Sequence, residues 1–143
     1  MSLLLIAHAA ATLDMVGAIW FVQLVHYPLL AALPASALPA RAAETTRRTA
    51  LLLGPVMGIE LACALGLAWT PPAGIAPRAA WGGLLLLGAA WLSTGLIQFP
   101  IHKRLARGDG ASEFGGLMRT NWLRVLLWTV RGGLALWMLA AAG

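Results

Sequence analysis

Four long apolar runs, separated by short polar stretches, set the pattern of the chain. They predict helices over about residues 3–30, 49–69, 78–101 and 120–142. A helix crosses the hydrocarbon core of a bilayer with about 20 residues, and each run reaches that length. Backbone groups in lipid must be hydrogen-bonded internally, and the runs are too long for the strands of a membrane barrel. The pattern therefore predicts an all-α fold, a bundle of four transmembrane helices.

The composition agrees with this prediction. Of the 143 residues, 60% are hydrophobic and only 10% are charged, whereas soluble domains carry about 25% charged residues. We therefore exclude a soluble fold and expect a single integral membrane domain over residues 1–143. The formal net charge is +5, but the basic residues form no continuous face, so we expect no nucleic-acid partner. No Lys or Arg precedes the first run, which favours a retained helix over a signal peptide.

Lysine and arginine concentrate in the first and third polar stretches. In short loops these residues stay on the cytoplasmic side of a membrane. Between the second and third runs, the one basic residue is Arg78. This distribution predicts that the first and third loops are cytoplasmic and that both termini lie outside the cytoplasm. The basic residues of these two stretches are Arg41, Arg47, Arg48, Lys103, Arg104, Arg107 and Arg119.

Short motifs recur between the two halves of the chain. GAIW at 17–20 matches GAAW at 88–91, and Tyr27-Pro28 matches Phe99-Pro100 at nearly the same offset along the chain. A two-helix unit repeated in tandem gives halves of the same orientation, related by an axis along the membrane normal. Small residues and interfacial aromatics also recur in unrelated membrane proteins. The sequence leaves both interpretations open.

Two ionisable residues fall near the middle of predicted spans. Glu60 follows Arg48 at the same separation along the chain as Arg131 follows Arg119. Because the rise per helical residue is constant, at about 1.5 Å, the two groups reach a similar depth. A buried charge is costly, and pairing reduces that cost. We predict an ion pair between Glu60 and Arg131, which either joins two helices or acts directly in binding or proton movement.

Further polar residues lie toward the cytoplasmic ends of the first and third runs. Gln23 and His26 share one helix face, and so do Gln98 and His102. A proline stands beside each pair, and it is expected to kink or end the helix there. Such a kink frees backbone groups beside polar side chains, which is one way to build an intramembrane cavity.

The fourth run places Asn121, Arg124, Trp128 and Arg131 on one helix face. This face must point into the bundle or into a wet cavity. Alternatively, Asn121 and Arg124 simply reach the membrane interface. We expect one polar pocket on the cytoplasmic side, with Trp128 as a further binding residue. The pocket residues are Gln23, His26, Glu60, Gln98, His102, Asn121, Arg124 and Arg131.

The chemistry of this predicted pocket suggests catalytic roles. His26 or His102 would serve as general base, because histidine titrates near neutral pH. Arg124 and Arg131 would stabilise negative charge that develops on a substrate oxygen.

Cofactor ligands are a second interpretation of the same residues. His26, His102 and Glu60 are candidates for a His–His–carboxylate metal set. No closely spaced metal motif accompanies them, and two scattered histidines also form simple hydrogen-bonded pairs. His8 or His26 is a candidate haem ligand. The sequence identifies no cofactor.

Three stretches carry a family resemblance: WFVQLVHYP at 20–28, QFPIH at 98–102 and NWLRVLLWTVR at 121–131. Through them the chain resembles a widespread group of small four-helix bacterial membrane proteins. It is more loosely similar to the anthrone-oxygenase-like membrane proteins, which share the size, the helix count and a Pro-x-His or Pro-x-Asn element ending the third helix. The resemblance implies a location in the bacterial inner (plasma) membrane. It also implies an enzyme that oxidises an aromatic or polyketide-like compound without a metal.

The expected partner of the whole chain is the lipid bilayer. Three classes of function are compatible with the predicted polar residues. The first is an oxidoreductase-like membrane enzyme that acts on a small apolar molecule. The second is a metal- or haem-binding redox module. The third is a non-catalytic structural subunit, within a homo-oligomer or a larger membrane complex. Gly54 with Gly58, and Gly82 with Gly83, would suit the close helix packing that the third class needs.

Overall fold

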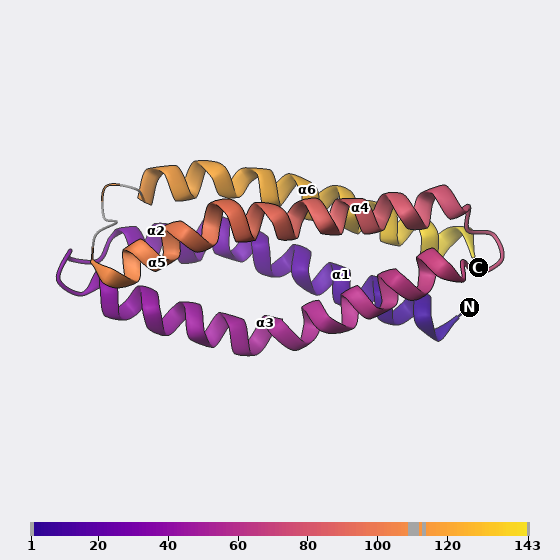
Figure 1. Cartoon of the computed structure of the whole chain (residues 1–143), viewed down its shortest axis with the longest axis horizontal. Helices are drawn as coiled ribbons and strands as arrows, with labels where there is room; N and C mark the ends of the chain where they lie inside the picture. The colour runs from indigo at the N-terminus through magenta and orange to yellow at the C-terminus, as the bar shows by residue number, and fades with distance from the viewer. Residues whose placement is uncertain (1, 109–111, 113, 143) are drawn as a thin grey trace.

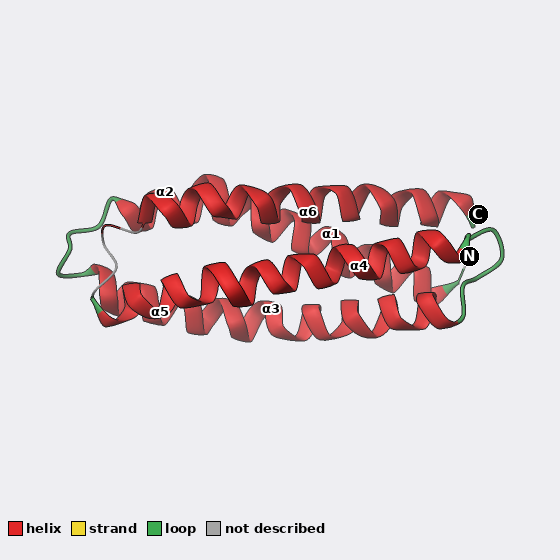
Figure 2. Cartoon of the chain, turned by 45° about the horizontal axis from the view of Figure 1, so that its top comes forward, coloured by secondary structure: helices red, strands yellow, loops and turns green. Residues whose placement is uncertain are grey.

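A computed structural model describes residues 2–108, 112 and 114–142. The described chain is all-α and forms four rods side by side (Figures 1 and 2). The first rod is continuous from α1 through η1 to α2, and the third from α4 through η2 to α5; η denotes a π-helical turn. The elements are α1 (Leu3–Phe21), η1 (Val22–His26), α2 (Tyr27–Ala31), α3 (Leu38–Trp69), α4 (Pro77–Ser93), η2 (Thr94–Gln98), α5 (Phe99–Arg107) and α6 (Phe114–Ala141).

All four rods are long and apolar enough to cross a membrane, and they cover Leu3–Ala31, Leu38–Trp69, Pro77–Arg107 and Phe114–Ala141. Large apolar side chains such as Leu52, Leu85 and Leu96 are exposed on the outer surface, as expected where lipid replaces water as the solvent. This is the architecture of a multi-pass membrane protein, and the predicted four-helix bundle is confirmed.

Successive rods are antiparallel, and the two chain ends lie at the same end of the bundle (Figure 1). The main contacts of α1 are with α3 and α6, and the main contacts of α4 are also with α3 and α6. Each rod thus packs against its neighbours in sequence, and α6 closes the bundle against α1. As a result α3 and α6 face one another diagonally across the centre.

Three layers of buried apolar residues fill the bundle along its length. One layer includes Tyr27, Leu105 and Leu117, near the end where α2 leads to α3. The middle layer is built from Met15, Ile19, Ala64, Leu87, Ala90, Val125 and Trp128. The third layer, near the chain ends, is built from Leu5, Leu67, Ile75, Ala80 and Met138.

Several helices are longer than the apolar runs. The second begins at Leu38 instead of about 49, the third continues to Arg107 instead of 101, and the fourth begins at Phe114 instead of 120. Charged residues end an apolar run without ending a helix. In α3, the Glu44 carboxylate accepts hydrogen bonds from the arginines three and four residues later, which supports the first turns. The apolar pattern therefore marks the extent of the lipid-facing part, not the helix ends.

Pro28 and Pro100, near the ends of the first and third runs, do not end their helices. A π-helical turn comes directly before each one. The Tyr27 N–H donates to the Val22 carbonyl, and the Phe99 N–H donates to the Thr94 carbonyl, each five residues back. The wider π turn changes the register of the backbone hydrogen bonds just before the proline, which has no N–H to donate. The helix therefore continues past the proline. The two π turns stand at matching positions of the two halves, before Tyr27-Pro28 and Phe99-Pro100, which favours the duplication interpretation of the sequence.

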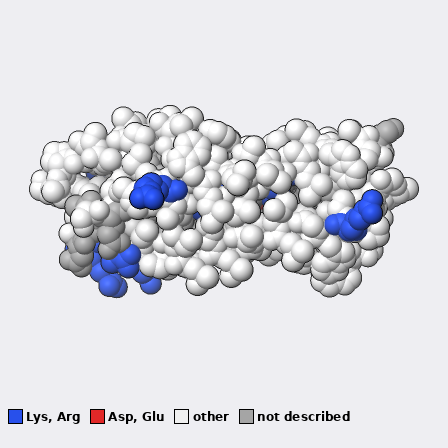
Figure 3. Space-filling view, turned by 90° about the horizontal axis from the view of Figure 1, so that it is seen from above, with Lys and Arg blue, Asp and Glu red and all other residues white. Residues whose placement is uncertain are grey.

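Basic side chains gather at one end of the bundle, here called the basic end, where α2 leads to α3 and α5 leads to α6. Figure 3 shows this concentration on one face, with a separate basic group at the opposite end. The opposite end holds both chain ends (Figure 1) and Arg78 near the start of α4. The charge asymmetry expected from the sequence is thus present along the long axis of the bundle.

Candidate functional site

The polar residues inside the bundle form two separate groups instead of one pocket. Glu60 and Arg131 lie with His8 and Thr12 in a group here called the ion-pair cluster. The remaining predicted residues lie closer to the basic end. Arg131 is two helical turns beyond Arg124 on α6, about 10 Å along the helix axis. Its guanidinium reaches His8, near the start of α1, and so points away from the basic end.

The ion-pair cluster is built on a contact between diagonal helices. Arg131 Nε lies 2.7 Å from Glu60 Oε1, and the two side chains are 1% and 0% exposed. The Thr12 hydroxyl donates to the same carboxylate oxygen at 3.0 Å. The predicted pairing of Glu60 with Arg131 is therefore confirmed.

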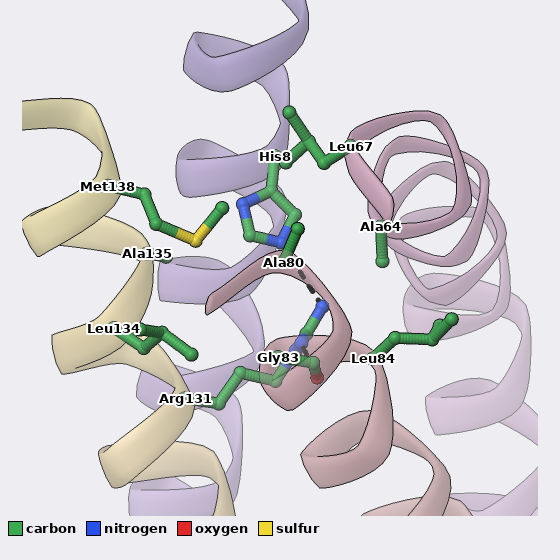
Figure 4. Close-up of a pocket in the computed structure, with 10 residues that line it drawn as sticks. All are labelled: His8, Ala64, Leu67, Ala80, Gly83, Leu84, Arg131, Leu134, Ala135 and Met138. Atoms are coloured by element: carbon green, nitrogen blue, oxygen red, sulfur yellow. Dashed lines mark hydrogen bonds between the residues drawn. The ribbon is translucent and has the colours of Figure 1, made fainter. Parts of the chain in front are cut away.

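The other two nitrogens of the Arg131 guanidinium also have hydrogen-bond partners. Nη1 donates to the Gly83 carbonyl, and Nη2 lies 3.2 Å from His8 Nε2. Figure 4 shows His8 and Arg131 pointing toward one another from α1 and α6, beside α4. Because arginine only donates, His8 Nε2 accepts, which places the proton of a neutral imidazole on Nδ1. All four rods thus meet at one arginine.

The ion-pair cluster is closed. The space beside His8 and Arg131 has a volume of about 0 Å³ for a water molecule. A Cβ added at Gly83 would lie 3.3 Å from Arg131 Nη1, so the glycine lets the arginine approach the α4 backbone. His8 Nε2 accepts a hydrogen bond from Arg131 beside this closed space, and haem ligation by His8 stays a prediction.

The contact between Glu60 and Arg131 also bears on the internal repeat. The two residues are 71 residues apart, which is the offset of the GAIW and GAAW motifs. Equivalent positions of two repeats touch one another only close to the axis that relates them. A contact between these two positions agrees with the duplication interpretation, which the sequence left open, and it lies where α3 and α6 face each other.

A cavity of about 300 Å³ lies closer to the basic end, between α1, α3 and the third rod, and is here called the cavity site. Its walls are largely apolar. The α3 wall includes the exposed residues Thr49, Ala50 and Gly54, so the cavity opens to the outer surface of the bundle. The lining residues are Met15, Ala18, Ile19, Val22, His26, Tyr27, Thr46, Thr49, Ala50, Leu53, Gly54, Met57, Thr94, Gln98, Phe99, His102 and Arg124.

Two histidines and a tyrosine meet in the wall of the cavity site. The Tyr27 hydroxyl lies 3.1 Å from His102 Nε2. The ring centroid of Tyr27 lies 5.8 Å from that of His26 and 5.9 Å from that of His102. His102 Nδ1 is buried and has no hydrogen-bond partner among the described residues. The Tyr27 hydroxyl is thus placed to orient the His102 imidazole.

Arg124 enters the cavity site from α6 and is held from behind by amides. Its Nη1 donates to Asn121 Oδ1 at 3.1 Å, and Asn121 Nδ2 donates to Gln23 Oε1 at 2.8 Å. Gln23 in turn donates to the Met118 carbonyl at 3.2 Å. Arg124 Nε is buried and, in the part of the chain that the structure describes, has no partner.

The predicted site residues are thus distributed in three ways. His26, Gln98, His102 and Arg124 line the cavity site. Gln23 and Asn121 lie behind it, as supports for Arg124. Trp128, predicted to bind a ligand, instead packs in the middle core layer and is 1% exposed. Its burial follows from its place on the inward face of α6, between the two polar groups.

The predicted metal set is not assembled. Glu60 belongs to the ion-pair cluster, whereas His26 and His102 line the cavity site. Among the described residues, no group of three or more His, Cys, Asp or Glu side chains is placed to hold a metal ion. The reason is that Glu60 is turned toward the diagonal helix α6, where Arg131 neutralises it.

Sequence reasoning missed Tyr27 and Thr12 as contributors, and it considered His8 only as a haem ligand. Tyr27 was noted only as part of a motif, although it is the one tyrosine of the chain and adjoins His26. His8 and Thr12, four residues apart, share a face of α1, and this spacing was the available signal.

Comparison with protein-family models, with curated proteins and with solved structures found no match to the chain. The two polar groups are therefore the basis for assigning a function.

Proposed function

We propose that this protein is a membrane enzyme that binds a small lipophilic molecule in the cavity site and transfers a proton on it. The observation that carries the proposal is the cavity of about 300 Å³ with a largely apolar lining and a few convergent polar groups. Small-molecule sites usually combine these features. Because the cavity opens to the outer surface of the bundle, the molecule enters from the bilayer.

In this proposal His102 is the general base. When its Nε2–H donates to the Tyr27 oxygen, the unpartnered Nδ1 carries the lone pair and accepts the proton. Arg124 neutralises negative charge on an oxygen of the bound molecule, in a site of low dielectric where such an interaction is strong. Arg131 has no catalytic role here, because its donors are used within the ion-pair cluster.

The oxidation implied by the family resemblance stays a prediction, as does a metal- or haem-binding role for His26 or His102. A purely structural subunit would account for the ion-pair cluster but leaves the cavity site without a purpose, so we favour the enzyme. The basic end supports an orientation in the bacterial inner membrane with that end in the cytoplasm and both chain ends outside. A homo-oligomer or a larger complex stays a further prediction.

Deuterium exchange tests the proposal without a known substrate. The protein in lipid nanodiscs is incubated in heavy water with a lipophilic extract of the source membranes, and mass spectrometry follows deuterium uptake into carbon positions. We expect uptake into one compound with the unchanged protein, and loss of at least about 100-fold in rate with His102→Gln. His26→Gln, which changes the second histidine of the cavity, should lower the rate less.

Two results would contradict the proposal. One is a search in which no compound gains deuterium above empty nanodiscs. The other is equal uptake with the unchanged protein and with His102→Gln. Ala18→Leu, which places a larger side chain in the cavity wall, provides an independent variant: it should abolish uptake by excluding the molecule and not by changing the base.

A further inference from the structure

Arg124 has no counter-ion among the residues that the structure describes. Ion pairs between described residues join Glu44 to Arg47 and Arg48, and Glu60 to Arg131. None of them includes Arg124, whose hydrogen-bond partner is the neutral amide of Asn121. A charged group inside a membrane span is expensive unless it is paired. This cost is present in the resting protein and not only during a reaction. A ligand that carries a negative charge when it binds would remove the cost by supplying a counter-ion to Arg124.

The geometry of the guanidinium selects the kind of anion. Nη1 is occupied by Asn121, whereas Nε is buried and has no partner in the described part of the chain. The edge formed by Nε and Nη2 is therefore the one that Asn121 leaves free, on a side chain that lines the cavity. Two parallel N–H donors on one edge match the two oxygens of a carboxylate, which arginine binds in a bidentate fashion.

The remainder of the cavity specifies the body of the ligand. Away from Arg124 the walls are formed by side chains such as Met15, Ile19, Leu53 and Met57. These side chains offer no hydrogen bonds and favour an apolar body of matching size. The amide chain from Asn121 through Gln23 to the Met118 carbonyl holds the guanidinium in place before any ligand arrives.

We propose that the cavity site binds a small lipophilic carboxylate, with its carboxylate on the Nε–Nη2 edge of Arg124 and its apolar body between α1 and α3. The inference rests on the proposed function for the presence of a ligand in the cavity, and adds the charge of that ligand. It also separates two roles in the site: Arg124 holds the head group, and His102 acts on the body nearby.

Decanoate and decanol are suitable probes, because they share one apolar chain and differ in the head group. Equilibrium binding of each radiolabelled probe is measured on the protein in nanodiscs of neutral lipid, with binding to empty nanodiscs subtracted. We expect decanoate to bind about tenfold or more tightly than decanol, since a hydrogen bond to a charged group contributes about 1.5–3 kcal/mol.

The variants locate the preference on one side chain. Arg124→Gln should remove the preference for decanoate and leave decanol binding unchanged. Arg124→Lys should keep part of it, because the charge stays but the two-donor edge is lost. Arg119→Gln is the matched control: it removes the same charge from an exposed position of the same helix, outside the lining of the cavity, and should behave as the unchanged protein.

The outcomes distinguish this inference from the proposed function. If decanol binds as tightly as decanoate, or if Arg124→Gln and Arg119→Gln bind decanoate equally, the carboxylate inference is overturned. If decanol binds and Ala18→Leu abolishes that binding, the ligand site of the proposed function survives that failure. If neither probe binds, both proposals fall. The comparison of the two probes on the unchanged protein needs no variant, so the test holds even where Arg124→Gln does not fold.

Discussion

Two arginines of α6 point into the bundle, and they differ in what neutralises them. Arg131 finds a carboxylate, a carbonyl and an imidazole within the chain. Among the described residues, Arg124 finds one neutral amide and a cavity. An arginine whose three nitrogens all find partners inside the protein joins helices together. An arginine with a buried, unused donor beside a cavity is positioned to meet something from outside.

The two arginines also differ in the amount of open space beside them. The volume open to water is about 0 Å³ beside Arg131 and about 300 Å³ beside Arg124. Small residues have opposite effects in the two places. Gly83 brings the backbone of α4 onto Arg131, whereas Gly54 has no neighbouring atom within 4 Å of an added Cβ. The same residue type closes one site and leaves the other open.

The largest effect is expected from breaking the ion pair. Arg131→Met leaves the Glu60 carboxylate buried without its cation and should lower the free energy of unfolding by about 3–5 kcal/mol. Denaturation in mixed micelles of detergent and SDS measures this. Adding Glu60→Leu to Arg131→Met should recover most of the loss, because two apolar side chains replace an ion pair with little cost.

Arg124→Met is the control for this comparison. It removes one hydrogen bond, worth about 1 kcal/mol, but it also removes an unpaired charge from the membrane span, so the free energy of unfolding should change little. If Arg124→Met and Arg131→Met destabilise the protein equally, the distinction between the two arginines is wrong.

The second prediction compares space directly, with the same substitution in both sites. Ala64→Leu enlarges a side chain beside Arg131, where no room is left, and should cost about 1–3 kcal/mol through overpacking. Ala18→Leu enlarges a wall of the cavity site and should leave the free energy of unfolding unchanged or higher. The same micelle titration tests both. Equal destabilisation by the two variants would show that the cavity is not open space.

The smallest effect is expected from Tyr27→Phe. It removes the hydroxyl at 3.1 Å from His102 Nε2 and should lower the free energy of unfolding by about 1 kcal/mol. It should also slow the proposed deuterium exchange, because His102 loses the group that orients it. Decanol binding serves as the internal control and should not change. An unchanged exchange rate would remove Tyr27 from the proposed mechanism.

The candidate site could be predicted only in part, and particular residues show why. The pairing of Glu60 with Arg131 was predictable, because each charge needs a partner and both lie at one depth. The participation of His8 was not, since it meets Arg131 across 123 residues of sequence. The grouping of Glu60 with His26 and His102 failed for a related reason. Depth along a helix follows from counting residues, but the direction of a side chain around the bundle depends on which helices are neighbours.

The sequence by itself determined the four membrane spans and the basic end, because hydrophobicity and charge act locally along each helix. It also showed which residues were too polar to face lipid. Only the tertiary structure decided that His8 and Gly83 complete the partners of Arg131 and that a cavity lies beside Arg124. The packing of α3 diagonally to α6 places the internal carboxylate opposite one arginine and a cavity beside the other. That choice depends on the rotation of each helix about its axis, which is set by contacts between residues far apart in the chain.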